Sequence, residues 1–327
     1  MTDLILTNGD SSIELIRSVC GEDLVILPWR DVLHEGPLAP SGQLDELAPV
    51  RAIYLSDEFG LVYGDVAQSF VERNETVKRW NEFEKISLWF EHDLYDQLQI
   101  LEIVNFFAGQ PEVSLQKLEI VQSGEYLGHM TPTEAEKLAQ LARPVTKTEL
   151  DLGKQVWKAF CSETPESWAA LLEDDLSALL FLKPAVERQL EELPDQNGVT
   201  RTERQILRIL EEKPSHPSDL FHVSQSMEEA MFMGDWSFFS ILERMSQGEM
   251  PLVEASPIDA VFSRPGSEHW KAFSASSIRL TSDGLRVVRD RIDYGLKRPS
   301  SWVWGQKVEV GAMVWRWNQH SQQLLFS

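Results

Sequence analysis

Ile86-Ser-Leu-Trp-Phe-Glu-His-Asp-Leu-Tyr-Asp-Gln97 starts as an apolar strand and then breaks into three titratable residues, Glu91, His92 and Asp93. Leucines then follow at positions 94, 98 and 101, which is the spacing of one helix face. Titratable side chains at a strand-to-helix junction lie at the carboxyl edge of a sheet, where open α/β folds bind ligands. The stretch therefore predicts both an α/β fold and the position of a site.

Three further short apolar runs, at residues 4–7, 24–27 and 118–121, are predicted to be strands of the same sheet. The first run leads into helical periodicity over residues 13–19, as strands of parallel sheets do. The runs are largely apolar and do not alternate with polar residues, which indicates burial on both faces, as is typical of a parallel sheet. We expect an α/β class protein with a Rossmann-like parallel sheet in a first domain, residues 1–130.

The chain after residue 130 is predicted to be mostly helical. A threonine followed three residues later by a glutamate can close a capping box at a helix start. This pattern occurs at Thr131/Glu134, Thr146/Glu149 and Thr200/Glu203. The Pro194-Asp-Gln-Asn-Gly198 cluster predicts a boundary. It separates a helical linker region, 131–197, from a C-terminal domain, 198–327.

The C-terminal domain is expected to be a winged-helix-like α+β domain. Three short helices are predicted at residues 202–210, 218–225 and 236–246, followed by an extended pair at 252–254 and 277–280. Three helices and a hairpin, in that order, form the winged-helix variant of the helix-turn-helix. Alternating tryptophans predict one final hairpin, and these are Trp302, Trp304, Trp315 and Trp317.

The charge and cysteine content favour a cytoplasmic protein. The chain has 327 residues, a net charge of −22 and a pI near 4.7, a balance that generally repels nucleic acid and anionic membranes. Its two cysteines, Cys20 and Cys161, suggest neither a disulfide framework nor a zinc site. The N-terminal residues carry an acid where a signal peptide carries basic residues, and no apolar run is long enough for a membrane span.

Four motifs resemble a known bacterial family. They are Leu6-Thr-Asn-Gly-Asp-Ser11, Trp29-Arg-Asp-Val-Leu-His-Glu-Gly-Pro37, Leu88-Trp-Phe-Glu-His-Asp-Leu-Tyr-Asp-Gln97 and Phe232-Met-Gly-Asp-Trp236. The first three resemble the family catalogued as domain of unknown function 1835, which is often paired with a second uncharacterised domain, number 3658. The resemblance implies a bacterial cytosolic protein and supplies no activity, so the site has to be argued from the residues.

Polar residues follow all four predicted strands, and in a parallel sheet these loops share one edge. The loop after the first strand contains Asn8, Gly9, Asp10 and Ser11. The backbone amides of this loop, at the start of a helix, can hold a phosphate or carboxylate. A helix cap by Asp10 or Ser11 explains the same residues equally well. The lysine and second glycine of a P-loop are missing.

The loop after the second strand carries Arg30, Asp31, His34 and Glu35 within six residues. This set offers a bidentate clamp for an anion together with an acid–base pair. The alternative is an internal ion-pair network that holds a long loop in place. The loop after the fourth strand adds further polar groups, which are Ser123, Gly124, Glu125 and His129.

Glu91, His92 and Asp93 are the strongest candidates in the chain. A histidine between two carboxylates can act as a general base with an orienting group, and the carboxylates can bind a hard divalent ion. The sequence leaves open a Mg²⁺ or Mn²⁺ ion on Asp10, Glu91 and Asp93. Asp93 and Asp96 can equally be the N-cap and third residue of the following helix.

These residues predict an enzyme or a ligand-binding protein for a small anionic molecule, phosphorylated or nucleotide-like. His92 or His34 would move the proton, and Glu91 or Asp31 would orient it. Asn8, Gly9, Asp10, Ser11, Arg30, Glu35 and Asp93 would contact the ligand. The residues do not decide between catalysis and binding, nor do they fix the oligomeric state.

The alternative prediction is a ligand-sensing regulator whose C-terminal domain binds nucleic acid or a protein. A local basic surplus near the chain end supports it, and the residues concerned are Arg286, Arg289, Arg291 and Arg298. The net charge disfavours nucleic acid. The third helix of the predicted winged helix has a single basic residue, Arg244, and is largely apolar, which favours docking of a protein.

Overall fold

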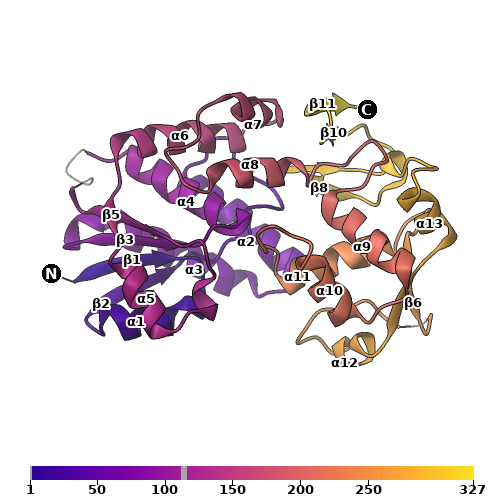
Figure 1. Ribbon diagram of the computed structural model, residues 1–327, viewed down its shortest axis with the longest axis horizontal. Helices are drawn as coiled ribbons and strands as arrows, with labels where there is room; N and C mark the ends of the chain where they lie inside the picture. Colours follow the sequence, from indigo (N-terminus) through magenta and orange to yellow (C-terminus); the bar gives the residue numbers. More distant parts are fainter. Residues whose placement is uncertain (1, 112–115, 259) are drawn as a thin grey trace. The chain divides into compact units, whose positions relative to one another are not determined.

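The computed structural model describes residues 2–111, 116–258 and 260–327 (Figure 1). The chain divides into two compact units, Met1–Glu187 and Arg188–Ser327. The first unit is built on a sheet with helices on both faces, and the second combines helices with small antiparallel sheets. The protein is therefore of the mixed α/β class that the sequence predicts.

The sheet of the first unit has five strands in the order β2-β1-β3-β4-β5. Strands β1 (Asp3–Thr7), β2 (Leu24–Pro28), β3 (Ile86–Phe90) and β4 (Leu118–Gln122) are parallel. Strand β5 (Arg143–Pro144) pairs antiparallel with β4. The four parallel strands are confirmed. The edge strand β5 was not predicted, because two exposed residues leave no apolar pattern to recognise.

Helices cover both faces of this sheet (Figure 1). Helices α1 (Ile13–Cys20) and α5 (Pro132–Ala139) contact each other and pack on one face. Helices α4 (Leu94–Ala108) and α6 (Lys147–Phe160) contact each other and pack on the opposite face. Because successive strand residues point to opposite faces, the central strands are largely apolar on both faces.

Strand β1 illustrates this double burial. Ile5 belongs to the core under α1 and α5, whereas Leu4 and Leu6 belong to the core under α4. In β3, Trp89 lies in the first core and Leu88 in the second. The buried side chains on both faces explain why no polar alternation interrupts these runs.

Between β2 and β3 the chain forms two long helices that pack on each other, α2 (Leu44–Phe59) and α3 (Tyr63–Lys78). They contribute Leu44 and Val77 to the core under α4. The shorter helical segments of this part are η1 (Asp10–Ser12), η2 (Trp80–Glu82), η4 (Leu127–His129), α7 (Glu166–Ala170), η5 (Leu171–Glu173) and α8 (Leu182–Leu190).

The second unit begins its compact core with three helices, α9 (Arg201–Glu212), α10 (Pro217–Gln225) and α11 (Asp235–Met245). Strands β6 (Val253–Ser256) and β7 (Ser277–Leu280) follow and pair antiparallel. A single antiparallel bridge joins Ser215 to Ile278 of β7. The remaining helices are α12 (Trp270–Ser274), α13 (Ser282–Val288) and η6 (Gly295–Lys297).

The end of the chain forms two hairpins, where the sequence predicted one. Strands β8 (Ser301–Val303) and β9 (Gln306–Val308) pair with each other, and β10 (Trp315–Asn318) pairs with β11 (Gln323–Phe326). A tight turn closes the first hairpin, where Trp304 and Gly305 have φ of 50° and 69°. The predicted alternation of tryptophans thus spans two separate ribbons. In the described part of the chain, no helix is long and apolar enough to cross a membrane.

Candidate functional site

The order of the strands changes direction between β1 and β3. From β1 the chain passes through α1 to β2 on one side, and from β3 it passes through α4 to β4 on the other side. Helices α1 and α4 lie on opposite faces, so the loops that follow β1 and β3 diverge. This is the topological switch point at which open α/β sheets bind ligands.

A hydrogen bond joins the two diverging loops at this point. Asn8, which follows β1, donates from Nδ2 to Oδ2 of Asp96 in α4 over 2.9 Å. The backbone amide of Glu91, which follows β3, donates to Oδ1 of the same carboxyl group over 2.5 Å. The Asp96 carboxyl group therefore joins the loop after β1, through Asn8, to the loop after β3, through Glu91.

Three buried carboxyl groups gather there, and we call Glu91, Asp93 and Asp96 the acid cluster. One oxygen of each group lies within 4.8 Å of the others. The amide of Leu127, in the loop after β4, donates to Oε1 of Glu91 over 2.7 Å. Asp93 is the N-cap of α4 and accepts from the amide of Asp96 over 3.2 Å, which confirms the capping interpretation. Capping uses one oxygen of Asp93 and does not exclude a second role.

Burial raises the pKa of all three carboxyl groups. It raises the pKa of Asp93 to about 7, and the neighbouring Glu91 carboxylate contributes to the shift. Burial and the other two carboxylates hold the pKa of Asp96 well above its usual range. Burial also raises the pKa of Glu91, although the hydrogen bond from Leu127 opposes the shift. Buried carboxyl groups this close together favour a bound proton or a cation among them.

The donors present fit a hard divalent cation. The acid cluster supplies only oxygen ligands, as Mg²⁺ and Mn²⁺ prefer. The amide oxygen of Asn8 is buried and has no hydrogen-bond partner within the described residues. Asp10, which the sequence analysis included in the ligand set, lies outside the acid cluster, and Asp96 takes its place.

Asp10 instead pairs with Arg30 across the loops that follow β1 and β2. Two hydrogen bonds of 2.5 and 2.8 Å join the guanidinium to the carboxylate, and both side chains are exposed. The Arg30 guanidinium lowers the pKa of Asp10. Gly9 and Ser12 are the residues at the N-cap positions of η1 and α1, and neither makes a side-chain cap. An anion clamped by the same two nitrogens of Arg30 would have to displace Asp10.

The second loop is held by a buried arginine that sequence reasoning missed. Arg51 of α2 donates from Nε to Oδ1 of Asp31 over 2.8 Å, and both side chains are fully buried. Its other nitrogens donate to the backbone carbonyls of Val32, Glu35 and Pro37. Asp31 therefore serves the loop network, which was the alternative interpretation for this residue.

The same loop lies beside the start of α4. Gln99 donates from Nε2 to the carbonyl of Asp31 over 3.0 Å. The buried His34 ring contacts the ring of Tyr95 edge-on, with centroids 6.3 Å apart. Tyr95 and Gln99 were not predicted as site residues. Both residues lie in the first two turns of α4, directly after the Glu91–Asp93 segment. Because those turns are at the same sheet edge, this position in the sequence could have identified them as site residues.

His92 lies between two members of the acid cluster in sequence, and its ring packs among aromatic side chains. Its centroid is 5.0 Å from that of Tyr126 and 5.8 Å from that of Phe181. Burial lowers the pKa of His92, and the nearby Glu125 carboxylate partly offsets this effect. A neutral imidazole can accept a proton at physiological pH.

The basic residues proposed to touch nucleic acid are mostly paired with acids. Arg289 lies 2.7 Å from Glu211, and Arg286 lies 3.1 Å from Asp283. Arg298 lies 2.5 Å from Glu203, and that pair is largely buried. Among the described residues, Arg291 has no ion pair. In α11, every residue from Ser237 to Leu242 is buried, which leaves this helix no open face for a DNA groove.

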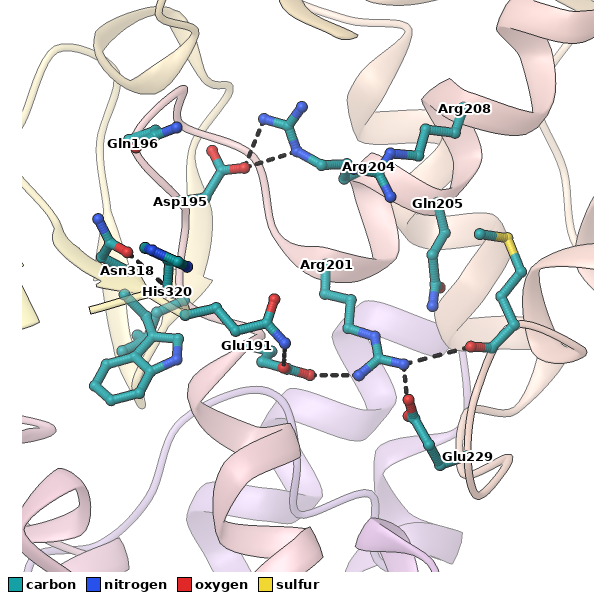
Figure 2. A pocket seen from close by; sticks show the side chains of 14 residues that line it. Glu191, Asp195, Gln196, Arg201, Arg204, Gln205, Arg208, Glu229, Asn318 and His320 are labelled. Carbon is teal, nitrogen blue, oxygen red and sulfur yellow. Dashed lines mark hydrogen bonds and ion pairs between the residues drawn. The ribbon is translucent and has the colours of Figure 1, made fainter. Parts of the chain in front are cut away.

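A separate pocket of about 690 Å³ occurs within the second unit (Figure 2). Arg201, Arg204 and Arg208 line it from one face of α9. Figure 2 shows Arg201 between Glu191 and Glu229. The ion pairs to these two carboxylates are each 2.6 Å long. The sequence analysis did not identify this pocket, although arginines at i, i+3 and i+7 marked the face. The guanidiniums of Arg201 and Arg204 are already neutralised by carboxylates.

Comparisons with known proteins add little to this geometry. No family model and no curated protein matches the sequence. Among solved structures, the chain is similar to the crystal structure of the Plasmodium falciparum topoisomerase II DNA-binding, cleavage and re-ligation domain, with 13% identity and a TM-score of 0.48. That similarity covers 100% of this chain and 54% of the other, so this chain spans about half its length. At this level it carries no argument about fold or function.

Proposed function

We propose that this protein binds a small anionic molecule, phosphorylated or nucleotide-like, at the carboxyl edge of the parallel sheet. The observation that carries the proposal is the acid cluster, whose three buried carboxyl groups approach within 4.8 Å at the switch point between β1 and β3. Asn8 joins this cluster from the loop after β1. Residues from separate loops thus converge where the fold favours a ligand.

A buried acid cluster repels an anion, so a divalent cation belongs to the proposal. Mg²⁺ is commonly bound by one or two carboxylates and keeps its other positions for water and substrate phosphates. Glu91, Asp93 and Asp96 would hold the ion, with the amide oxygen of Asn8 beside them. The cation would then bridge the protein to the anionic ligand and polarise its oxygens.

If the protein is an enzyme, the candidate proton-transfer groups are His92 and His34. His92 is flanked by Glu91 and Asp93, and His34 lies in the loop that Arg51 holds beside α4. Both come from loops at the same sheet edge. Arg30 is exposed in the loop after β2 and would exchange its Asp10 partner for a ligand phosphate.

The test is calorimetric titration of metal-free protein with Mn²⁺, then with nucleotides and sugar phosphates in its presence. We expect saturable Mn²⁺ binding that Asp93→Asn and Asp96→Asn each weaken at least tenfold, and a ligand that binds only with the metal. Asp45→Asn is the matched control, because Asp45 pairs with Lys78 on the surface and should leave binding unchanged. Unchanged Mn²⁺ binding in both cluster variants would refute the site.

We also infer that the segment from α9 to β7 is a winged helix that docks a protein. The Ser215–Ile278 bridge supports this inference. Ser215 lies between the first and second helices, and through this bridge it pairs with β7 beside the β6–β7 hairpin, as the first strand of a winged helix does. The burial of α11 argues against a DNA reader. Fluorescence anisotropy at low salt should show no binding of duplex DNA. Tight binding that weakens with salt and with charge reversal at Arg289 would restore the nucleic-acid alternative.

A further inference from the structure

Three aromatic rings form a partly exposed group at the same edge of the sheet, and we call His92, Tyr126 and Phe181 the aromatic wall. The His92 ring lies 5.0 Å from the Tyr126 ring and 5.8 Å from the Phe181 ring, measured between centroids. The residues come from the loop after β3, the loop after β4 and the segment before α8. All three side chains are only half-buried.

The aromatic wall is not part of the apolar core beneath it. The core on this face of the sheet consists of buried aliphatic residues and Trp89, and it includes none of the three rings. Core aromatics in the same unit, such as Phe90 and Phe107, are fully buried. The rings of the aromatic wall, by contrast, keep part of their surface in solvent, where a ligand can contact them.

Two residues of the aromatic wall are next in sequence to residues that form or contact the acid cluster. His92 is bonded in sequence to Glu91 and Asp93, and Tyr126 precedes Leu127, whose amide donates to Glu91 over 2.7 Å. Gly124, in the loop after β4, lies beside the Phe181 ring, since an added Cβ would meet it at 3.8 Å, an ordinary contact distance. The aromatic wall and the acid cluster therefore share the loops that follow β3 and β4.

We propose that the ligand of this site carries a planar heteroaromatic base that stacks on the aromatic wall. Its class would be a nucleoside phosphate, with the phosphate bound through the cation at the acid cluster. This inference rests on the proposed function and narrows its substrate class, because a sugar phosphate has no ring face to stack. Stacking of a base on an aromatic side chain is worth about tenfold or more in affinity.

The experiment compares two probes in the presence of Mn²⁺, adenosine 5′-monophosphate and ribose 5-phosphate, by calorimetry on the full chain. We expect the nucleotide to bind at least tenfold more tightly than the sugar phosphate. Tyr126→Leu and Phe181→Leu should each remove most of that preference, and Tyr126→Phe should keep it, because it retains the ring. Phe262→Leu is the control, since Phe262 is a half-buried aromatic of the second unit.

Each outcome separates this inference from the proposed function. Equal affinities for the two probes, or a nucleotide preference that survives both leucine variants, would overturn the stacking role and leave the anion site standing. Binding of neither probe, in protein that has bound Mn²⁺, would overturn both proposals. Circular dichroism on every variant shows whether lost binding reflects a lost fold, and Tyr126→Phe provides a second test that does not remove the ring.

Discussion

Arg51 and Asp31 form an ion pair in which neither side chain is exposed, with Nε and Oδ1 2.8 Å apart. Arg51 also donates to three backbone carbonyls, so one side chain from α2 fixes the loop between Asp31 and Pro37. His34 owes its position beside Tyr95 to this loop. The ion pair and these hydrogen bonds together hold the start of the connection between β2 and β3 in place at the sheet edge.

Replacing Arg51 by leucine should destabilise the protein by about 3–5 kcal/mol, because it leaves the Asp31 carboxylate buried without its partner. Arg51→Lys should also be costly, since a lysine cannot reproduce the planar fork of donors. Urea unfolding measures both. Arg79→Ala, which breaks the exposed pair with Glu82, should cost at most about 1 kcal/mol. Equal costs at the two sites would contradict the role assigned to Arg51.

Gly36→Ala should destabilise the same loop by more than backbone strain alone. Gly36 has φ of 80°, and an added Cβ would lie 2.4 Å from the buried Tyr54 ring. Gly60→Ala is the matched control, because Gly60 has φ of 65° with no atom near an added Cβ. We expect strain of about 1 kcal/mol at Gly60 and a clearly larger loss at Gly36. Indistinguishable urea midpoints would show that Tyr54 moves freely.

The raised pKa of Asp93 predicts a pH-dependent stability in chelator-treated protein. Between the unfolded value of 3.8 and the folded value of about 7, the folded state binds the extra proton. The stabilisation is complete below about pH 4 and is lost as the pH rises through 7, with a slope of at most about 1.4 kcal/mol per pH unit. Asp93→Asn keeps the capping oxygen and should flatten this slope.

The raised pKa of Asp93 is tested by the difference in unfolding free energy between wild type and Asp93→Asn, measured from pH 5 to 8. Carboxylates with a lowered pKa, such as Asp10 and Asp45, lose their stabilisation below this window, so they do not interfere. Asp45→Asn should therefore shift stability by a constant amount across it. A constant shift for Asp93→Asn as well would mean that Asp93 is ionised in the folded protein.

His92→Ala should abolish ligand binding or turnover and cost no more than about 1 kcal/mol of stability, because the side chain is only half-buried. Chemical denaturation and calorimetry on the same preparation give the two quantities separately. Unfolded protein with unchanged affinity in the folded fraction would mark His92 as a packing residue.

Residue patterns predicted the strands well because their cause is local. Residues 86–90 are apolar except for Ser87, and every residue of β3 is buried, so the run and the strand coincide. The Thr131, Thr146 and Thr200 capping boxes were predicted and are all present, since each needs only four consecutive residues.

Long-range pairing could not be predicted in the same way. Nothing near Asp31 in the sequence indicates that Arg51 is its partner, because α2 has to fold back over the loop first. The basic surplus near the chain end looked free in sequence, and only the fold brings Glu211 to Arg289 and Glu203 to Arg298. Asp96 looked like a helix-start residue, and its second contact, with Asn8, depends on two strands lying side by side.

The hydrogen bond from Asn8 to Asp96 spans 88 positions of the chain. Its donor follows the first strand and its acceptor lies after the third, so Asn8 joins the acid cluster only when β3 has inserted beside β1. Any chain that has formed only the first two strands has half of the switch point and none of its carboxyl groups. Cation binding through Asn8 and the acid cluster would thus report that β3 has paired with β1.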